Sequence, residues 1–177
     1  MSIEPTFPFG VHTGQTNAQV WAYHEMITTF HVGLFVELGV DQGGLAATMI
    51  GRAFIDPDFS YLGVELLERV INRNVFNAVG RYRTRMVIGN CMDPGIVDYV
   101  AREIQQARGP ALLLCDNGNK PAEVKKYCEL LRPGDLLTVH DFGTEFLESD
   151  IPGFVNEFYA RDLDYENVGL PLWQRAK

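Results

Sequence analysis

Polar residues follow two short apolar segments of this sequence, and they are of the types that bind cations or accept protons. Asp116 and Asn117 follow one segment, and His140 and Asp141 follow the next one along the chain. If both segments are strands of one parallel sheet, their carboxyl ends lie at the edge where ligands bind. Carboxylate and amide oxygens suit Mg²⁺ or a similar divalent cation. These residues predict a cation site on Asp116 and Asp141, with Asn117 or His140 as a further ligand. Without a cation, His140 or Asp141 could act as a general base.

Ordinary structural roles would account for the same residues. Asp116 could cap the turn that follows it, Asp141 could fix a loop, and His140 could be a satisfied, partly buried histidine. Lys120 could pair with either carboxylate and occupy the space of a cation. The sequence leaves these alternatives open beside the cation site.

A glycine-rich turn is the second candidate site. Residues 37–44 read ELGVDQGG, between an apolar segment and a helical pattern. Glycines let the backbone turn sharply and let a ligand approach it closely, and the start of a helix offers free N–H groups. The spacing of Gly39, Gly43 and Gly44 lacks the GxGxxG of dinucleotide sites and the GxxxxGK[ST] of phosphate-binding loops. It therefore favours a ligand without a pyrophosphate and disfavours an NAD-dependent oxidoreductase.

An acidic residue, Glu65, follows the next apolar segment beyond this turn. A carboxylate at the end of the second strand can accept hydrogen bonds from both hydroxyls of a ribose. The turn and this acid together favour a nucleoside-type ligand more strongly than either does alone. Helix capping by Glu65 on an unrelated α/β fold is the alternative.

The elements that would position these residues alternate along the chain. Short apolar segments without polar alternation predict buried parallel strands at 34–38, 61–64, 86–88, 111–115 and 136–139. Helix-spaced apolar residues predict helices at 15–30, 44–54, 67–79, 94–108, 121–131 and 152–161. Asp93 is the expected N-cap of one helix, with Pro94 at its first position.

The end of the chain departs from this alternation. Segments 163–168 and 170–174 are typical of two strands joined by a tight turn at Gly169. The whole pattern predicts an α/β, doubly wound, Rossmann-like domain spanning residues 1–177, with residues 1–30 as an N-terminal extension and helix. Its sheet is expected to have seven strands, mostly parallel, with helices on both faces and an antiparallel C-terminal strand.

Composition excludes several classes of partner. The chain has 177 residues, with 15 basic and 23 acidic side chains and a formal net charge of −8. This charge repels phosphate backbones, so no nucleic-acid partner is expected. No apolar run approaches the roughly 20 residues of a membrane helix, so no membrane partner is expected either. The odd number of cysteines and the lack of a signal-like start favour reduced thiols and a cytoplasmic location.

Three motifs together resemble those of class I S-adenosylmethionine (SAM)-dependent methyltransferases. Residues 37–43 are similar to the first motif of that superfamily, and Gly63-Val64-Glu65 is similar to the second. Residues 130–137, LLRPGDLL, are similar to the turn that precedes its fifth strand. The resemblance covers residues 32–142 and implies a Rossmann-like fold with SAM as the cofactor.

The resemblance also implies roles for individual residues. Glu37 would lie near the methionine end of SAM, and Glu65 would hold the ribose hydroxyls. Leu66 would pack on the adenine, and Asn90 could bond its amine, although the usual acid is displaced to Asp93. The remaining expected cofactor contacts are Gly39, Val40, Gln42, Gly43, Gly44, Cys91 and Asp116.

The polar strand ends resemble those of cation-dependent small-molecule O-methyltransferases and of the cephalosporin-hydroxylase/rhamnosyl O-methyltransferase group. This sequence has His140 and Asp141 where the latter group has two acids. The implied function is methyl transfer from SAM to a small-molecule acceptor, first of all to a hydroxyl oxygen. A SAM- or nucleoside-binding protein without transferase activity is the alternative. Few residues remain for a substrate-selecting lid, so either the site is open or a second subunit of a homodimer completes it.

Overall fold

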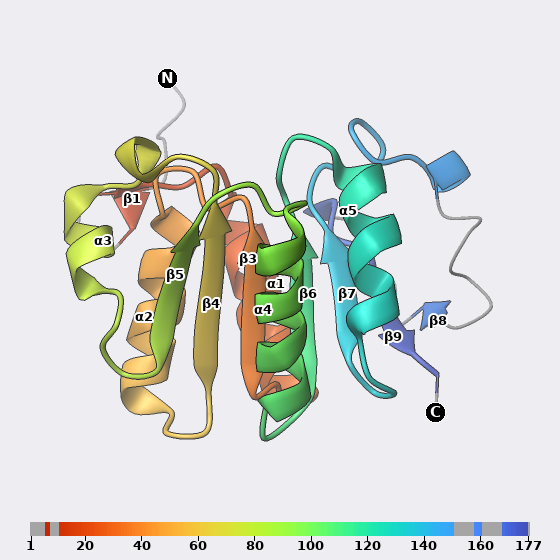
Figure 1. Ribbon diagram of the computed structural model, residues 1–177, viewed down its shortest axis with the longest axis horizontal. Coiled ribbons are helices and arrows are strands. Elements are labelled where there is room, and N and C mark those ends of the chain that lie inside the picture. The colour runs from red at the N-terminus through yellow and green to blue at the C-terminus, as the bar shows by residue number, and fades with distance from the viewer. Residues whose placement is uncertain (1–5, 8–10, 151–157, 161–167, 177) are drawn as a thin grey trace.

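A seven-stranded sheet crosses the molecule in the order β5-β4-β3-β6-β7-β9-β8 (Figure 1). This computed structural model describes residues 6–7, 11–150, 158–160 and 168–176. The parallel strands are β3 (Leu34–Leu38), β4 (Ser60–Glu65), β5 (Thr84–Ile88), β6 (Ala111–Cys115) and β7 (Leu136–Val139). Strands β9 (Leu172–Arg175) and β8 (Phe158–Ala160) extend the sheet in antiparallel fashion. A separate two-stranded sheet joins β1 (Thr6–Phe7) to β2 (Val11–His12).

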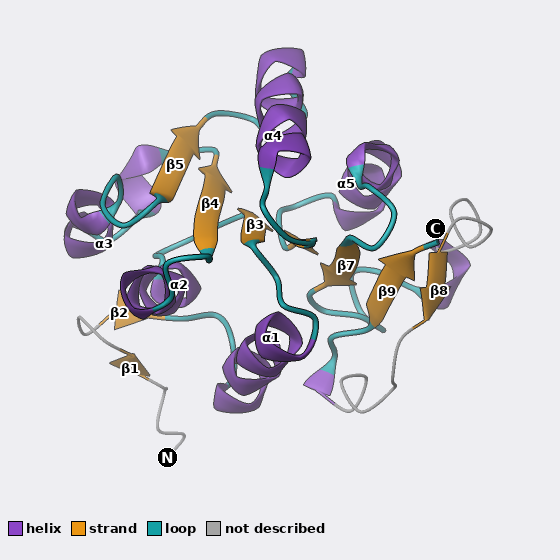
Figure 2. Cartoon of the chain, turned by 90° about the horizontal axis from the view of Figure 1, so that it is seen from below, coloured by secondary structure: helices purple, strands orange, loops and turns teal. Residues whose placement is uncertain are grey.

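The central strands are mostly apolar because helices cover both of their faces; Glu37 in β3 and Thr138 in β7 are the polar residues of β3, β6 and β7. Every residue of β3, β6 and β7 is buried. Helices α1 (Asn17–Thr29), α2 (Gly44–Ile55) and α3 (Arg73–Ala78) lie on one face, and α4 (Pro94–Gln106) and α5 (Lys120–Tyr127) lie on the other (Figure 2). Alternate residues of β3 enter the two cores: Phe35 packs on the α1–α2 side, and Val36 on the α4–α5 side. The predicted doubly wound fold is confirmed.

Helix boundaries differ from expectation where local capping intervenes. The helix expected over 67–79 is divided into a 3₁₀ turn at Glu68–Val70 and the short helix α3. Asn72 causes the break, because its side chain accepts a hydrogen bond from the backbone N–H of Asn74 and begins a new helix. The helix expected over 121–131 begins at Lys120 and ends at Tyr127, and a 3₁₀ turn follows at Cys128–Leu130.

The C-terminal prediction was partly wrong. Residues Phe158–Ala160 form strand β8, although a helix was expected over 152–161; the other residues of that range lie outside the described residues. Strand β9 pairs with β8 and β7, whereas a hairpin across Gly169 with residues 163–168 was expected. Most of that expected strand also lies outside the described residues. None of the helices in the described ranges combines the length and apolarity needed to cross a bilayer.

A buried ion pair links the connections that lead into β6 and β7. It lies at the amino ends of these parallel strands, whereas the polar residues of the site follow their carboxyl ends. Asp135, only 1% exposed, accepts hydrogen bonds from the backbone N–H groups of Ala111 (2.7 Å) and Arg132 (2.6 Å). The Arg132 guanidinium lies 3.0 Å from the Asp135 carboxylate and also donates to the carbonyls of Ala107 and Gly109. This network holds the starts of β6 and β7 in register.

We expect Asp135→Ala to lower the free energy of unfolding by about 3–5 kcal/mol, because it leaves a half-buried guanidinium and a buried N–H group without their partner. Urea denaturation measures the loss. The matched control is Asp58→Ala, which breaks the exposed ion pair with Arg108 and should cost less than about 1 kcal/mol. Equal losses for the two variants would contradict a structural role for the Asp135 network.

Candidate active site

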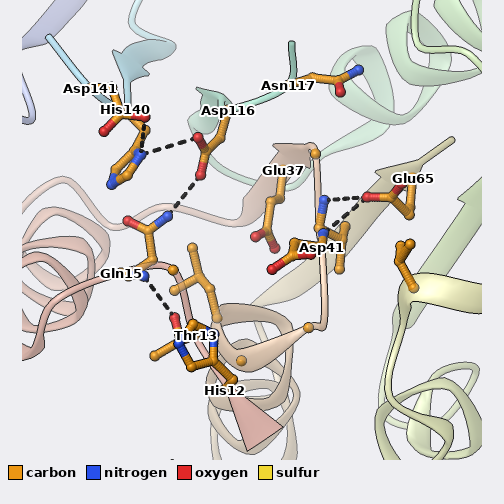
Figure 3. A pocket seen from close by; sticks show the side chains of 17 residues that line it. His12, Thr13, Gln15, Glu37, Asp41, Glu65, Asp116, Asn117, His140 and Asp141 are labelled. Carbon is orange, nitrogen blue, oxygen red and sulfur yellow. Dashed lines mark hydrogen bonds and ion pairs between the residues drawn. The ribbon is translucent and has the colours of Figure 1, made fainter. Parts of the chain in front are cut away.

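A cavity of about 470 Å³ opens at the carboxyl ends of β3 and β6 (Figure 3). Strand β3 pairs with β4 on one side and with β6 on the other, so the order of the strands reverses at this point. Ligands of doubly wound sheets bind at such a switch point. The cavity is lined from the glycine-rich turn by Glu37, Gly39, Val40, Asp41, Gly43, Gly44 and Leu45, and from the other strand ends by Glu65, Val70, Asp116, Asn117, His140 and Asp141.

The glycine-rich turn is packed too closely for side chains. Gly39 has a φ of +90°, and a Cβ there would lie 2.5 Å from the carbonyl oxygen of Asp116. A Cβ on Gly44 would lie 2.3 Å from the Cβ of Thr13. The turn is therefore held between the end of β6 and the loop that precedes α1.

That loop was missed by the sequence analysis. His12, Thr13, Gly14 and Gln15 line the cavity from the side of α1. The buried side-chain amide of Gln15 donates to Asp116 at 2.7 Å and accepts from the Tyr23 hydroxyl at 3.3 Å. The sequence signal for this loop was weak: Gln15 and Thr16 are polar and directly precede a helix of which Thr16 is the N-cap.

Glu37 is a buried acid at the end of β3. Its side chain is 2% exposed, and it accepts a 2.5 Å hydrogen bond from the Tyr61 hydroxyl. Burial raises the pKa of Glu37 well above its usual value, against the lowering effect of the Tyr61 hydrogen bond. The charges of Asp116, Glu65 and Asp41 raise this pKa further. The surroundings of Glu37 therefore disfavour its ionised form relative to a carboxyl group in water.

Glu65 supports the glycine-rich turn while it lines the cavity. One of its carboxylate oxygens accepts hydrogen bonds from the backbone N–H groups of Val40 (3.0 Å) and Asp41 (2.9 Å). The other oxygen accepts from Leu67 at 3.1 Å. A carboxylate can accept about four hydrogen bonds, so one position remains for a ligand hydroxyl. Both roles considered for this acid, ligand contact and backbone capping, are compatible with its position.

The strand ends bring Asp116, His140 and Asp141 into one cluster, in which one ligand atom from each lies within 4.8 Å of the others. The Nδ1 atom of His140 lies 3.2 Å from Asp116 and 3.0 Å from Asp141 (Figure 3). Its Nε2 atom is buried and has no hydrogen-bond partner among the described residues. Burial alone would lower the pKa of His140, but the hydrogen bond with Asp116 and the charges of both carboxylates raise it.

Lys120 places a positive charge beside the same cluster, as the alternative interpretation of the sequence expected. Its ammonium lies 3.6 Å from Asp116, 3.4 Å from Asp141 and 2.5 Å from Glu145. Burial alone would lower the pKa of Lys120, but the hydrogen bond with Glu145 and the charges of the two aspartates raise it overall. Glu145 was another residue that the sequence analysis did not find.

Several expected site residues lie away from this cluster or this cavity. The Asn117 side chain turns away from the two aspartates and donates to the Cys91 sulfur at 3.2 Å (Figure 3). Cys91 is itself buried in the α4–α5 core. Gln42, Leu66 and Asn90 are exposed and are not among the residues that line the cavity. The adenine side of the expected SAM site is thus open to solvent in the ligand-free protein.

A glycine-rich turn beside a strand-end acid, at the switch point of a doubly wound sheet, is the arrangement expected of a class I SAM-dependent methyltransferase. The family model described as Rhamnosyl O-methyltransferase/CmcI matches residues 4–156. The chain therefore belongs to this family, and the predicted assignment as a SAM-dependent O-methyltransferase is confirmed. The comparison with curated proteins found no match.

Solved structures with a similar fold include members of the same family. An apo structure of CmcI superposes with a TM-score of 0.78 at 17% identity, over 100% of this chain and 78% of that one. A structure titled as CmcI with Mg and SAM gives a TM-score of 0.75 at 18% identity, over 100% and 79% of the two chains. A putative caffeoyl-CoA O-methyltransferase from Staphylococcus aureus gives 0.64 at 13% identity, over 91% and 84%. At these identities the likeness shows the fold alone.

We expect Glu37→Gln to stabilise the ligand-free protein near neutral pH. An acid whose pKa is raised by folding makes the folded state lose stability as the pH rises from the unfolded-state value, about 4.3, toward the folded-state value. The neutral amide has no such loss and can still accept from Tyr61. At about pH 8 the variant should melt a few degrees higher, at about 2–4 °C for each kcal/mol gained.

The gain should disappear as the pH falls below about 4, where Glu37 becomes protonated in both the folded and the unfolded states. Differential scanning calorimetry across this range makes the measurement. Glu25→Gln, at an exposed position of α1, is the control and should show no comparable pH-dependent gain. A lower melting temperature for Glu37→Gln at about pH 8 would mean that the ionised carboxylate stabilises the fold.

Proposed function

We propose that this cavity holds SAM over the glycine-rich turn and that His140 accepts the proton of a small-molecule hydroxyl while its oxygen is methylated. The observation that carries the proposal is the state of the His140 ring. Its Nδ1 atom is held between two carboxylates, whereas its buried Nε2 atom has no partner among the described residues. Buried polar atoms are rarely left unpaired, so an unpaired one at a cavity suggests a ligand or water that completes it.

The residues of the cavity suit SAM as methyl donor. Gly39, Gly43 and Gly44 line the cavity without side chains, so a ligand can approach the backbone of the turn. Glu65 keeps one acceptor position for a ribose hydroxyl. Glu37 lies at the end of the cavity where the cationic methionine group is expected. A cation there would stabilise the ionised form of a carboxyl group, which its surroundings otherwise disfavour.

Methyl transfer then needs orientation and the removal of one proton. The acceptor oxygen forms a bond to the methyl carbon as the bond from that carbon to sulfur breaks, and the hydroxyl proton passes to Nε2 of His140. The products are a methyl ether, S-adenosylhomocysteine and an imidazolium, which later returns its proton to water. The carboxylates of Asp116 and Asp141 stabilise the imidazolium, in agreement with the raised pKa of His140.

A divalent cation is a second candidate for this cluster. Two carboxylates and an imidazole are ligands that such ions accept, and their atoms lie close enough together. Asp116, Asp141 and Nδ1 of His140 would hold it, and the structure does not bring Asn117 to them. A bound cation would lower the pKa of an acceptor hydroxyl. The solved structure of CmcI with Mg and SAM supports this candidate.

The remaining expectations on partners and location also stay proposals. We propose a small-molecule acceptor, without a nucleic-acid or membrane partner, and a second copy of the chain that could complete the open site. A cytoplasmic location is supported by the buried thiols of Cys91 and Cys115, which are not joined in a disulfide.

Glu65→Ala should weaken binding of SAM and S-adenosylhomocysteine by about 1–3 kcal/mol, the usual loss for hydrogen bonds to a charged group. Isothermal titration calorimetry measures both ligands. Because Glu65 also supports the turn, the 2′,3′-dideoxy analogue of S-adenosylhomocysteine is titrated in parallel. A ribose contact predicts that the wild type prefers the natural ligand and that the variant binds the two almost equally. If the variant loses the same affinity for both ligands, Glu65 acts through the turn alone.

His140→Asn should lower kcat for methyl transfer by about 10²–10⁴-fold while SAM affinity changes little, because it removes the base but not the donor site. Formation of S-adenosylhomocysteine in the presence of a panel of hydroxylated small molecules measures turnover. His31→Asn is the control, since His31 lies at the opposite edge of the sheet in a left-handed conformation that asparagine accepts. Unchanged turnover in His140→Asn would remove this histidine from the mechanism.

A further inference from the structure

Lys120 occupies a position that is unfavourable for a lysine on three counts. Its side chain is 4% exposed, although lysine is rarely buried without a partner. It is the first residue of α5, where the helix dipole disfavours a positive charge. It also gives up the conformational freedom of a long side chain. A compensating interaction must hold the ammonium there.

That interaction comes from three carboxylates on different segments. Asp116 follows β6, Asp141 follows β7, and Glu145 lies in the loop after Asp141; all three lie within 3.6 Å of the Lys120 ammonium. Asp116 and Asp141 are also the two acidic ligands of the candidate cation site. The lysine therefore neutralises the same oxygens that a divalent ion would need.

We propose that Lys120 is the built-in cation of this site and that it determines how tightly a divalent ion can bind there. While the ammonium remains among the carboxylates, a divalent ion meets a like charge within a few ångströms and finds its ligand oxygens already paired. Binding in the wild type is therefore weak. Without this charge, the same acids form a stronger cation site.

This proposal rests on the proposed cation site. It assigns to Lys120 a role in determining whether the cluster binds a divalent ion or accepts a proton through His140. While the Lys120 ammonium lies among the carboxylates, Nδ1 of His140 contacts both Asp116 and Asp141. A divalent ion on Nδ1 would require the imidazole to give up that hydrogen bond. The two arrangements exclude each other, and the position of Lys120 favours the one without a divalent ion.

The test is Mn²⁺ binding to the full-length protein, followed by electron paramagnetic resonance, for the wild type, Lys120→Met and Lys120→Arg. Methionine keeps the length of the side chain and removes the charge, whereas arginine keeps the charge. We expect Lys120→Met to bind Mn²⁺ at least about tenfold more tightly than the wild type. Lys120→Arg should remain as weak as the wild type. Lys126→Met, which removes a charge from an exposed position of the same helix, should not change the affinity.

Equal Mn²⁺ affinities of the wild type and Lys120→Met, whether tight or undetectable, would overturn the proposal. Thermal unfolding of each variant verifies the fold, and Lys120→Gln replaces Lys120→Met if that variant does not fold. SAM binding is measured by calorimetry in the same preparations without added metal. If the wild type does not bind SAM, the proposed methyl-donor site is refuted. An unchanged Mn²⁺ affinity in Lys120→Met with intact SAM binding would refute only the role of Lys120.

Discussion

The contact between the glycine-rich turn and the end of β6 is the constraint on which the site depends. A side chain at Gly39 would collide with the carbonyl group of Asp116, so the two strand ends meet through backbone alone. This contact places the turn that faces the methyl donor directly beside the first acid of the cluster. The hydrogen bond from the Asp116 N–H to the carbonyl of Leu38 fixes their relative position. The proposed donor site and the proposed proton acceptor are thus adjacent because of how two parallel strands end.

An excess of carboxylates around one cavity gives this site its electrostatic character. Glu37, Asp41, Glu65, Asp116 and Asp141 all line it. The protein reduces their repulsion by different means: the ionised form of Glu37 is disfavoured, Glu65 accepts backbone N–H groups, and Lys120 lies among the acids of the cluster. A cationic donor suits such a cavity, because its charge compensates acids that are otherwise only partly balanced.

The sequence alone was sufficient to predict the site residues that directly follow regular strands. Buried apolar strands were recognisable at 34–38, 111–115 and 136–139, and parallel strands that end in polar residues must bring those residues to one edge. The break at Asn72 and strand β8 escaped prediction, because a side-chain cap and pairing at the sheet edge outweighed helical periodicity. Side-chain direction escaped it as well: Asn117 follows Asp116 directly, yet it turns toward Cys91.

The loop before α1 contributes side chains to the site, although no sequence motif marks it. Tyr23 is fully buried in α1 and donates to the amide of Gln15, which in turn donates to one oxygen of Asp116. The other oxygen of Asp116 faces His140 and Lys120. A carboxylate held from both sides cannot rotate freely, so the orientation of the His140 ring depends on a helix outside the parallel βα units. Contacts between residues so far apart in the sequence, such as the hydrogen bond from Gln15 to Asp116, leave no local sequence pattern. The geometry of the proposed His140 base therefore depends on the packing of α1 as much as on the glycine-rich turn.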